Sequence, residues 1–289
     1  MNILYASDDN YAEIAAISIV SLLENNRDAG GIRIFILDNG LSEESKSRLS
    51  GMVGKYSQEI VFIPIPDIEA LVGAKLYVGC WALPIFARLF AASWLPADVD
   101  KIIYLDCDTL VRGSLAPLWD VNMDGYLIGG CEDGIDVAHK KEVFLEETDI
   151  YINSGMMLIN LKAWRDEGAE KKYIDFLLKH NGSLFYPDQD VVNVVSNGRI
   201  KLVPPKFNSM PFYFVYNPEL LLDANITDYY SQAELNEARD SPVTVHFAGA
   251  GRKPWVNGSE NVYKGEYMQY RGMTPWRDMP LREPELPAE

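Results

Sequence analysis

Short apolar runs alternate with helical segments through the first half of the chain, and this alternation constrains the fold more than any other feature. Strands are expected at Ile3–Ala6, Ile32–Leu37, Ile60–Ile65 and Ile102–Leu105. Helices are expected at Tyr11–Glu24, from Ser42 onward, and at Pro84–Trp94, where Pro96 ends the helix. Because strands that alternate with helices form parallel sheets covered by helices, the chain is predicted to be an α/β protein.

The second half continues this pattern less regularly. Its expected strands are Leu127–Gly130, Met156–Asn160 and Val243–Phe247, and its expected helices run from about Asp166 to His180 and from Asp188 to Ser196. From Pro275 to Glu289 the chain is rich in proline and glutamate, which is typical of a surface tail.

The charge balance and the cysteines exclude several classes of protein. Acidic residues outnumber basic ones 42 to 26, and a net charge of −16 disfavours nucleic acids and anionic membranes as partners unless a local basic patch overrides it. The three cysteines, Cys80, Cys107 and Cys131, are too widely spaced for a disulfide framework or a zinc site. They are expected to be small apolar residues in a reducing compartment.

The N-terminal region does not resemble a secretory signal, because Asp8 and Asp9 come too early for one. The apolar run Ile14–Leu23 is too short to span a bilayer. The protein is therefore expected in the cytoplasm.

Two acids end the apolar run Ile102–Leu105, and they are the strongest sign of chemistry. If the run is a buried strand, its period of two sends Asp106 and Asp108 to the same side of its end. Converging carboxylates suit a hard divalent cation, and open α/β sheets bind ligands at the carboxyl ends of their strands. A plain alternative is that the two acids only end the strand and solvate a turn.

A polar loop follows the first expected strand. In Ala6-Ser7-Asp8-Asp9-Asn10-Tyr11, Asp8 could accept a hydrogen bond from a base and Tyr11 could stack on it. Taken alone, the loop is read as readily as a helix cap formed by Asp8, Asp9 or Asn10, with Tyr11 as packing.

Three later segments also combine polar groups with a plain structural alternative. Asn153-Ser154-Gly155 is a ligand-binding loop or a common turn. Pro187-Asp188-Gln189-Asp190 opens a helix, where Asp188 would be a good cap and one acid or Gln189 could face a sugar. His246 ends a late strand just before Arg252 and Lys253, and it is either a metal ligand near a phosphate or a structural histidine.

The order of these segments carries more information than any one of them. It runs Asp-Asp-Asn-Tyr, Asp-x-Asp, Asn-Ser-Gly, Asp-Gln-Asp, His-Phe-x-Gly and Lys-Pro-Trp, with matching stretches at Leu118–Asp120 and Leu158–Trp164. From about Met1 to Trp255 the sequence resembles glycosyltransferase family 8, the retaining enzymes similar to bacterial lipooligosaccharide α-galactosyltransferases.

The resemblance implies a GT-A fold, a Rossmann-like mixed central sheet flanked by helices, over residues 1–260, with 261–289 as a C-terminal extension. It assigns uracil and ribose to Ala6, Asp8, Asn10 and Tyr11. It assigns Mn²⁺ to Asp106, Asp108 and His246, and the diphosphate to Gly249 and Lys253. It assigns the donor sugar to Arg88, Asn153, Asp188 and Gln189, and donor or acceptor hydroxyls to Asp133. The family usually spaces the loop glycine and the lysine by two residues, and here three separate them, so Arg252 is an alternative phosphate contact.

The implied reaction moves galactose or glucose from a UDP-sugar to a saccharide or glycolipid acceptor of a bacterial surface glycan such as lipopolysaccharide. Gln189 is a poor nucleophile, so retention by same-face attack is favoured, with Asp190 as a fallback nucleophile for double displacement. Some relatives attach to membranes through a basic C-terminal extension. Here Arg282–Glu289 is net acidic, which disfavours contact with the inner face of the membrane.

Two other functions compete with this one. A strand followed by Asp106-Cys107-Asp108-Thr109-Leu110 also resembles the nucleophile motif of haloacid-dehalogenase-type phosphatases. That motif normally lies near the start of its domain, and it leaves the N-terminal loop and His246 unexplained. A non-catalytic nucleotide-sugar-binding module is the second alternative, although it should have lost part of the proposed metal-binding or catalytic set.

Overall fold

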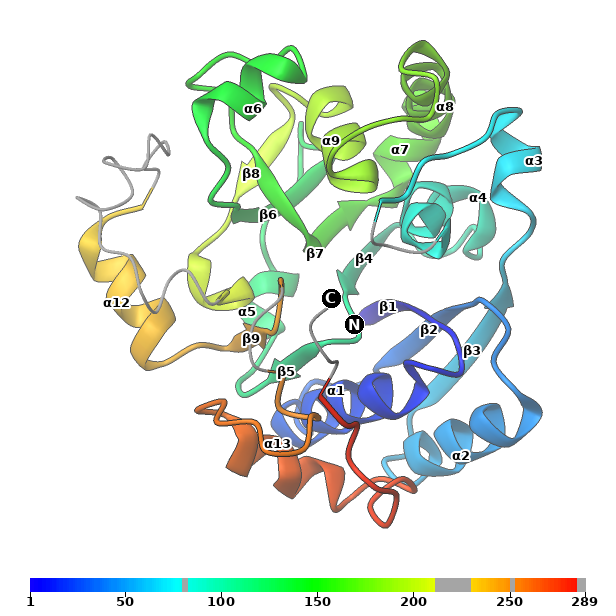
Figure 1. Ribbon diagram of the computed structural model, residues 1–289, viewed down its shortest axis with the longest axis vertical. Coiled ribbons are helices and arrows are strands. Elements are labelled where there is room, and N and C mark those ends of the chain that lie inside the picture. The colour runs from blue at the N-terminus through cyan, green and yellow to red at the C-terminus, as the bar shows by residue number, and fades with distance from the viewer. Residues whose placement is uncertain (80–82, 211–229, 250–252, 285–289) are drawn as a thin grey trace.

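A seven-stranded mixed sheet forms the centre of the molecule (Figure 1). The computed structural model describes residues 1–79, 83–210, 230–249 and 253–284. In spatial order the strands are β3 (Glu59–Pro64), β2 (Arg33–Asp38), β1 (Asn2–Ser7), β4 (Lys101–Leu105), β7 (Ile152–Asn160), β6 (Ile128–Glu132) and β8 (Ile200–Leu202). Within this described sheet only β7 is antiparallel to its neighbours, β4 and β6. The prediction of an α/β protein with a mostly parallel sheet is confirmed.

Helices cover both faces of this sheet. One apolar layer includes α1 (Ala12–Asn25), α2 (Glu43–Gly54), α5 (Ala116–Trp119) and α13 (Lys264–Arg271). The other includes α3 (Ile68–Val72), the 3₁₀ helix η1 (Leu83–Phe90), α4 (Ala91–Trp94), α7 (Leu161–Glu167), α8 (Ala169–Lys179) and α9 (Pro187–Val195). Toward the β6 and β8 side lie α6 (Val137–Glu142) and α12 (Gln232–Asp240) (Figure 1). The 3₁₀ helix η2 (Pro205–Asn208) packs against β6 and α12. A separate pair of strands, β5 (Thr109–Val111) and β9 (Thr244–His246), is antiparallel.

Alternation along β4 fills both layers and positions the first acid. Ile103 and Leu105 pack on the α1 side of the sheet, whereas Ile102 and Tyr104 pack on the other side. Asp106 continues the phase of Tyr104, whose hydroxyl donates to Asp106 Oδ1 at 2.7 Å. The strand period therefore directs Asp106 toward the layer that contains η1 and α9.

Two expected helices differ in detail from the structure. Pro84–Trp94 is a 3₁₀ segment followed by one short α-helix, because the backbone at Phe90 (φ −106°, ψ 14°) leaves α-helical geometry. The helix expected from Asp166 to His180 is instead two helices, α7 and α8. They meet at Gly168, whose φ of 62° ends the first one.

The strand expected at Met156–Asn160 is longer than predicted. It begins at Ile152, so the Asn-Ser-Gly segment lies inside β7 and not in a turn. This is possible because Asn193 satisfies the strand backbone where β7 begins. Ile152 N donates to Asn193 Oδ1 at 2.7 Å, and Asn193 Nδ2 donates to Ile152 O at 2.8 Å.

The helix caps follow the sequence at one place and depart from it at two. Ser42 caps α2 as predicted, since its side chain accepts from Ser45 N at 3.2 Å. The expected Asp188 cap of α9 is wrong, because the N-cap position falls at Tyr186. In α1 the N-cap position is Tyr11 and not Asp8, Asp9 or Asn10, although Asp8 Oδ1 accepts from Tyr11 N at 3.0 Å in the turn that leads into the helix.

The C-terminal segment packs against the first helix of the chain. In Figure 1, α13 lies along α1, and the Arg271 guanidinium pairs with Glu13 at 2.6 Å. Beyond α13, Trp276 is 5% exposed and belongs to the apolar layer of α1. The surface tail expected from Pro275 is therefore wrong for the start of that segment. A domain division at residue 260 stays a prediction.

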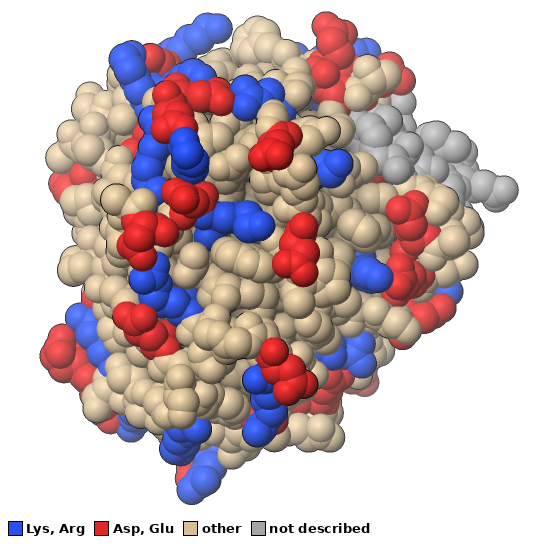
Figure 2. Space-filling model, turned by 180° about the vertical axis from the view of Figure 1, so that it is seen from behind, with Lys and Arg blue, Asp and Glu red and all other residues tan. Residues whose placement is uncertain are grey.

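Acidic and basic side chains lie interspersed on the face shown in Figure 2. Cys107 and Cys131 are free and buried, as predicted, while Cys80 lies outside the described residues. Burial, together with the neighbouring Asp106, raises the pKa of Cys107, so this thiol is a poor nucleophile. Within residues 1–79, 83–210, 230–249 and 253–284, no helix has the length and apolar character needed to cross a bilayer.

Candidate functional site

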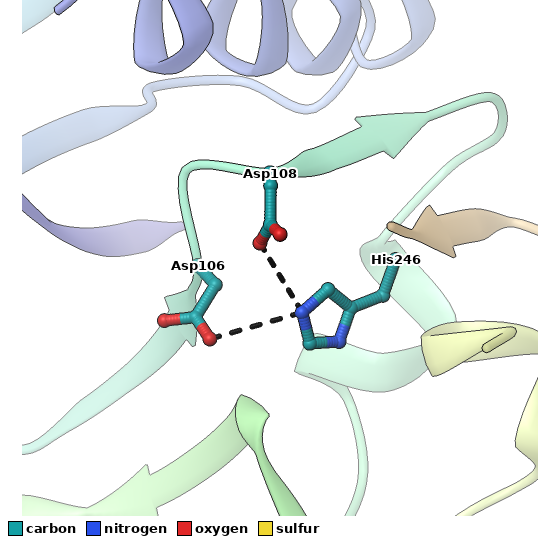
Figure 3. Close-up of side chains that lie close together, drawn as sticks. All are labelled: Asp106, Asp108 and His246. Carbon is teal, nitrogen blue, oxygen red and sulfur yellow. Dashed lines mark ion pairs between the residues drawn. The ribbon is translucent and has the colours of Figure 1, made fainter. Parts of the chain in front are cut away.

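Three side chains that could hold a metal ion converge at the carboxyl end of β4 (Figure 3). His246 Nε2 lies 3.2 Å from Asp108 Oδ1 and 3.8 Å from Asp106 Oδ2. One ligand atom from each residue lies within 4.8 Å of the other two. The structure thus brings together the three residues that were predicted as metal ligands.

Pairing of β5 with β9 brings the distant histidine to the acids. Thr109 faces His246 in the antiparallel register, and Phe247 N donates to Asp108 O at 2.9 Å. Both acids lie beyond the end of β4, so the strand period from which their convergence was predicted does not extend to Asp108. The chain turns after β4, where Thr109 Oγ1 donates to Asp106 O at 2.8 Å. A turn, and not the strand period alone, makes the two carboxylates converge.

The other ring nitrogen of His246, Nδ1, contacts the side-chain amide of Asn208. His246 Nδ1 lies 3.1 Å from Asn208 Oδ1, and Asn208 Nδ2 donates to Asn153 Oδ1 at 3.0 Å. With its nitrogen used as a donor, Asn208 offers an oxygen that accepts from a protonated Nδ1. When Nε2 gives up its proton, this tautomer leaves the Nε2 lone pair facing Asp106 and Asp108, which is the arrangement that metal coordination requires.

The charges of the cluster stabilise one another. Burial of Asp108 favours its neutral acid, but His246 and Lys253 outweigh burial and hold the pKa of Asp108 below its ordinary value. Burial of His246 favours the neutral imidazole, yet Asp108 and Asp106 outweigh it and raise the pKa of His246. A divalent cation bound here would replace the imidazole proton between the two carboxylates.

The backbone of Gly155 lies against the cluster. A Cβ at this position would lie 2.2 Å from His246 Cε1 and 2.8 Å from Asp106 Oδ2, so a larger residue requires the ligands to shift. The cluster itself offers carboxylate oxygens and one imidazole nitrogen, a mixed donor set that suits Mn²⁺ better than Mg²⁺ or Ca²⁺. The residues present therefore fit a divalent cation of this kind.

A second polar group lies where β7 meets α9. Gln189 Oε1 accepts from Ser154 N at 3.0 Å and from Asn153 Nδ2 at 3.2 Å. Gln189 Nε2 and Asn153 Nδ2 each donate to Asp133 Oδ2 at 2.9 Å. The structure thus joins Gln189, Asn153 and Asp133 in one hydrogen-bonded group, with the Gln189 amide held in a single orientation.

Arg88 links this group to the metal-ligand cluster. Its Nη2 donates to Asp106 Oδ1 at 2.9 Å, its Nη1 donates to Ser154 O at 2.8 Å, and its Nε lies 3.1 Å from Asp188 Oδ2. The Arg88–Asp188 contact is an ion pair without hydrogen-bond geometry, and Asp188 Oδ2 accepts no hydrogen bond from the described residues. Burial raises the pKa of Asp188 although Arg88 opposes the shift. This buried oxygen is a ready acceptor for a ligand hydroxyl.

Asp190 has a different set of partners. Its Oδ1 lies 2.8 Å from His139 Nε2 and accepts from Tyr151 OH at 2.6 Å, while its Oδ2 accepts from Tyr186 N at 3.0 Å. The residue is 0% exposed. The hydrogen-bond partners of Asp190 differ from those of Gln189 and Asn153, and protein groups occupy both of its carboxylate oxygens, which disfavours Asp190 as a nucleophile. The carboxylate instead connects α6, the residue before β7 and the N-cap of α9.

The N-terminal loop lies beside the acids. Cys107 Sγ donates to Ala6 O at 3.1 Å, which joins the end of β1 to the turn between Asp106 and Asp108. The four residues predicted to hold uridine are in or next to this loop, at Ala6, Asp8, Asn10 and Tyr11. Asp8 Oδ1 accepts from Tyr11 N at 3.0 Å, and Tyr11 is 43% exposed.

The predicted diphosphate contacts follow β9. Lys253 Nζ donates to Asp108 Oδ2 at 3.2 Å and also to Phe247 O, so its charge lies at the cluster. Gly249 is exposed and has a φ of 72°, a conformation that favours glycine. Arg252, the alternative phosphate contact, lies outside the described residues.

Several residues that shape the site were not predicted. Tyr104 could have been found, because it precedes Asp106 by two positions on the same strand face. Asn208, His139 and Tyr151 carry no local signal. Each reaches the site from a segment whose position depends on the tertiary fold.

Comparison with known proteins places these features in one family. The model of the glycosyl transferase family 8 matches residues 2–258. General stress protein A of Bacillus subtilis is 28% identical over 286 residues, which cover 96% of this chain and 94% of that protein. A lipopolysaccharide 1,2-glucosyltransferase of Escherichia coli is 29% identical over 289 residues, covering 98% of this chain and 81% of that enzyme.

A solved structure extends the comparison to the fold. The galactosyltransferase LgtC, in complex with donor and acceptor sugar analogues, matches with a TM-score of 0.80 and 27% identity, over 96% of this chain and 99% of LgtC. The predicted GT-A fold is confirmed by this match. The family model also spans the Asp106–Asp108 pair, the N-terminal loop and His246 together, which the phosphatase alternative does not explain. The chain therefore belongs to glycosyl transferase family 8 and is a glycosyltransferase.

Proposed function

We propose that the protein transfers a hexose from a UDP-sugar to a glycan acceptor, with retention of the anomeric configuration and dependence on Mn²⁺. The observation that carries the proposal is the convergence of Asp106 and Asp108, from the turn after β4, with His246 at the end of the distant strand β9. A second, buried polar group built on Gln189 and Asn153 lies next to this cluster through Arg88.

The first role of the site is to stabilise a diphosphate leaving group. Mn²⁺ held by Asp106, Asp108 and His246 would supply Lewis-acid stabilisation of the charge that UDP gains as the glycosidic bond breaks. Lys253 adds a positive charge beside Asp108. We assign contact with the diphosphate to Lys253 and Gly249, with Arg252 as the alternative.

The nucleotide is assigned to the N-terminal loop. The half-exposed ring of Tyr11 offers a surface on which a uracil ring can stack. Asp8 is a hydrogen-bond acceptor for a base or ribose group, and the loop at Ala6 and Asn10 offers backbone groups. The link between Cys107 and Ala6 supports this assignment, because it holds the loop close to the acids.

The donor sugar is assigned to the group at β7 and α9. Asp188 Oδ2 pairs with Arg88 Nε at 3.1 Å but accepts no hydrogen bond from the described residues, so it keeps capacity to accept from a sugar hydroxyl. Arg88, Asn153 and Asp133 provide further donors and acceptors. The Gln189 amide oxygen, held by Ser154 N, is the group that we place nearest the anomeric carbon.

Retention is what the family resemblance implies, and the residues of the site bear on which of its two routes is used. An amide oxygen is a poor nucleophile, and Asp190 is buried with protein partners on both carboxylate oxygens. We therefore favour same-face attack, in which the leaving phosphate assists the acceptor hydroxyl. In this mechanism Gln189 stabilises positive charge at the anomeric carbon.

The relatives indicate the classes of donor and acceptor. A glucosyltransferase and a galactosyltransferase are similar to this chain to nearly the same degree. We therefore propose UDP-glucose or UDP-galactose as donor and a saccharide or glycolipid of a bacterial surface glycan as acceptor. The reaction is expected in the cytoplasm, where free thiols such as the buried Cys107 and Cys131 persist.

The test is a measurement of UDP release from UDP-galactose and UDP-glucose, with Mn²⁺, with Mg²⁺ and with a chelator. We expect release from one of the two sugars that requires metal and is fastest with Mn²⁺. Absence of metal-dependent release from both would contradict the proposal. Binding of UDP without any release or transfer would favour the non-catalytic binding module.

A further inference from the structure

The C-terminal segment reaches the proposed nucleotide site through Arg282. Its backbone pairs with the loop that carries Lys253: Arg282 N donates to Trp255 O at 3.1 Å, and Asn257 N donates to Arg282 O at 2.7 Å. Val256 and Arg282 form an isolated parallel bridge between these contacts. The backbone of Arg282 is therefore fixed to the loop that we assign to the diphosphate.

The side chain of Arg282 extends to the other half of the proposed nucleotide site. Its guanidinium carbon lies 5.4 Å from the centroid of the Tyr11 ring and over its face. Its Nη2 donates to Asn10 O. A guanidinium over an aromatic ring is an attractive contact, and the hydrogen bond fixes the backbone next to that ring. A single residue thus contacts both loops.

Buried contacts hold this segment in place before it reaches Arg282. Arg271 is 4% exposed, pairs with Glu13 in α1 and donates to Arg277 O at 2.9 Å and to Met279 O. Trp276 is buried in the apolar layer that also contains the core residues of α1. The position of Arg282 is therefore set by the folded core and not by a free chain end.

Charge also couples Tyr11 to the rest of the site. Burial raises the pKa of Tyr11 and the carboxylate of Asp108 raises it further, whereas Arg282 opposes the shift. The Tyr11 hydroxyl therefore senses the charge of Asp108 as well as that of Arg282, which lies over its ring.

We propose that Arg282 is a positioning residue of the nucleotide site. It fixes the position of the loop that carries Tyr11 relative to the loop that carries Lys253. The inference rests on the proposed function, because it takes these loops as the uridine and diphosphate contacts. It adds a residue from the C-terminal extension, which the sequence interpretation had placed outside the catalytic region. Arg282 acts through Tyr11 and Asn10, so it should affect nucleotide binding more than the transfer step.

The test compares Arg282→Ala with wild type and with Arg277→Ala. Arg277 lies in the same segment, but its side chain is 65% exposed and, among the described residues, pairs only with the neighbouring Asp278, so it is a matched control. For Arg282→Ala we expect the Kd of UDP with Mn²⁺ and the KM of the UDP-sugar to rise about tenfold, with kcat within about twofold. Arg277→Ala should match wild type in all three.

Two further variants separate positioning from loss of structure. Arg282→Met keeps the aliphatic stem and the backbone pairing but removes the guanidinium, and it should show the same rise in Kd at an unchanged melting temperature. Arg282→Lys should recover part of the affinity through its charge. In a double-mutant cycle, Arg282→Ala and Tyr11→Ala should weaken UDP binding by less than the sum of their separate effects, because they act through one contact.

The outcomes distinguish this inference from the proposed function. If wild type does not bind UDP with Mn²⁺, the proposed function is wrong and the inference falls with it. If wild type binds UDP and Arg282→Met binds it equally well, only the positioning role is overturned. Equal losses in kcat and nucleotide affinity, or fully additive effects with Tyr11→Ala, would also overturn it.

Discussion

The two halves of the candidate site are built in different ways. Beside β7 and α9, Asn153, Asp188 and Gln189 are 9%, 2% and 5% exposed, and the amides bind neighbouring protein groups. In the N-terminal loop, Tyr11 is 43% exposed, and the hydrogen bonds of Asp8 stay within the loop. The sugar half is thus fixed by the core, whereas the nucleotide half depends on contacts from other segments.

This difference indicates a division of labour. Groups that stabilise a developing charge act best when they are held rigidly before the substrate arrives, as the Gln189 amide is. A loop with few buried contacts can instead order around its ligand. Substitutions in the sugar half should therefore lower kcat, and those in the nucleotide half should weaken binding.

The largest effect is expected where the two halves meet, at the metal-ligand cluster. Asp108→Ala removes one proposed ligand and the partner of Lys253. We expect a loss of about 10³-fold or more in UDP release, because the leaving-group charge loses its stabilisation, with little change in melting temperature. Asp98→Ala, at an exposed acid that pairs with Arg33, is the control. Undiminished turnover in Asp108→Ala would remove that residue from the cluster's function.

A smaller but more selective effect is expected in the sugar half. Gln189→Ala should lower kcat about 100-fold while leaving the Kd of UDP unchanged, because its amide faces Asn153, Ser154 and Asp133 and not the nucleotide loop. Turnover and UDP titration on the same preparation give both values. An equal loss in kcat and in UDP affinity would assign Gln189 to nucleotide binding and would contradict the proposed difference between the two halves of the site.

Gly155 tests how closely the cluster is packed. Gly155→Ala places a Cβ 2.2 Å from His246 Cε1, so we expect Mn²⁺ affinity to fall about 10- to 100-fold as the ligands shift. Gly129→Ala in the neighbouring strand β6 is the control, since its Cβ would meet nothing closer than 3.4 Å. Metal titration of both variants makes the comparison. Unchanged affinity in Gly155→Ala would show that the cluster tolerates displacement.

The smallest effect is expected at the outer edge of the sugar half. Burial opposes protonation of His139, but the hydrogen bond and charge of Asp190, with Glu142 and Asp136, raise the pKa of His139. A raised folded-state pKa contributes stability that is complete below the unfolded-state value and is lost as pH rises through the folded-state value.

His139→Gln should therefore melt about 2 °C below wild type at about pH 5.5 and show a smaller difference at about pH 8.5. Thermal melts at the two pH values provide the measurement. A difference that grows with pH would reverse the sign of this argument.

Much of the fold could be predicted from the sequence because periodicity reports local structure directly. The strand Ile102–Leu105 and its two acids were found from an apolar run and its ending. Two predicted helices are divided in the structure, at Phe90 and at Gly168. In each case the backbone conformation of a single residue ends the helix, and hydrophobic spacing does not report such a conformation.

The rest of the site could not be predicted because it depends on pairing between distant segments. His246 meets the acids only through the register of β9 with β5, and its tautomer depends on Asn208 from another element. Asp190 looked like an available carboxylate in sequence, yet His139 and Tyr151 occupy it in the folded protein. Residue type alone does not reveal such partners.

The central claim is that Asp106, Asp108 and His246 form one metal centre. Its most direct test is titration of Mn²⁺ in the presence of UDP, followed by electron paramagnetic resonance or calorimetry, for wild type, His246→Ala and the control His180→Ala. The account predicts a single Mn²⁺ site in wild type and in His180→Ala, and affinity weakened about 100-fold or more in His246→Ala. Binding to His246→Ala with wild-type affinity would contradict it.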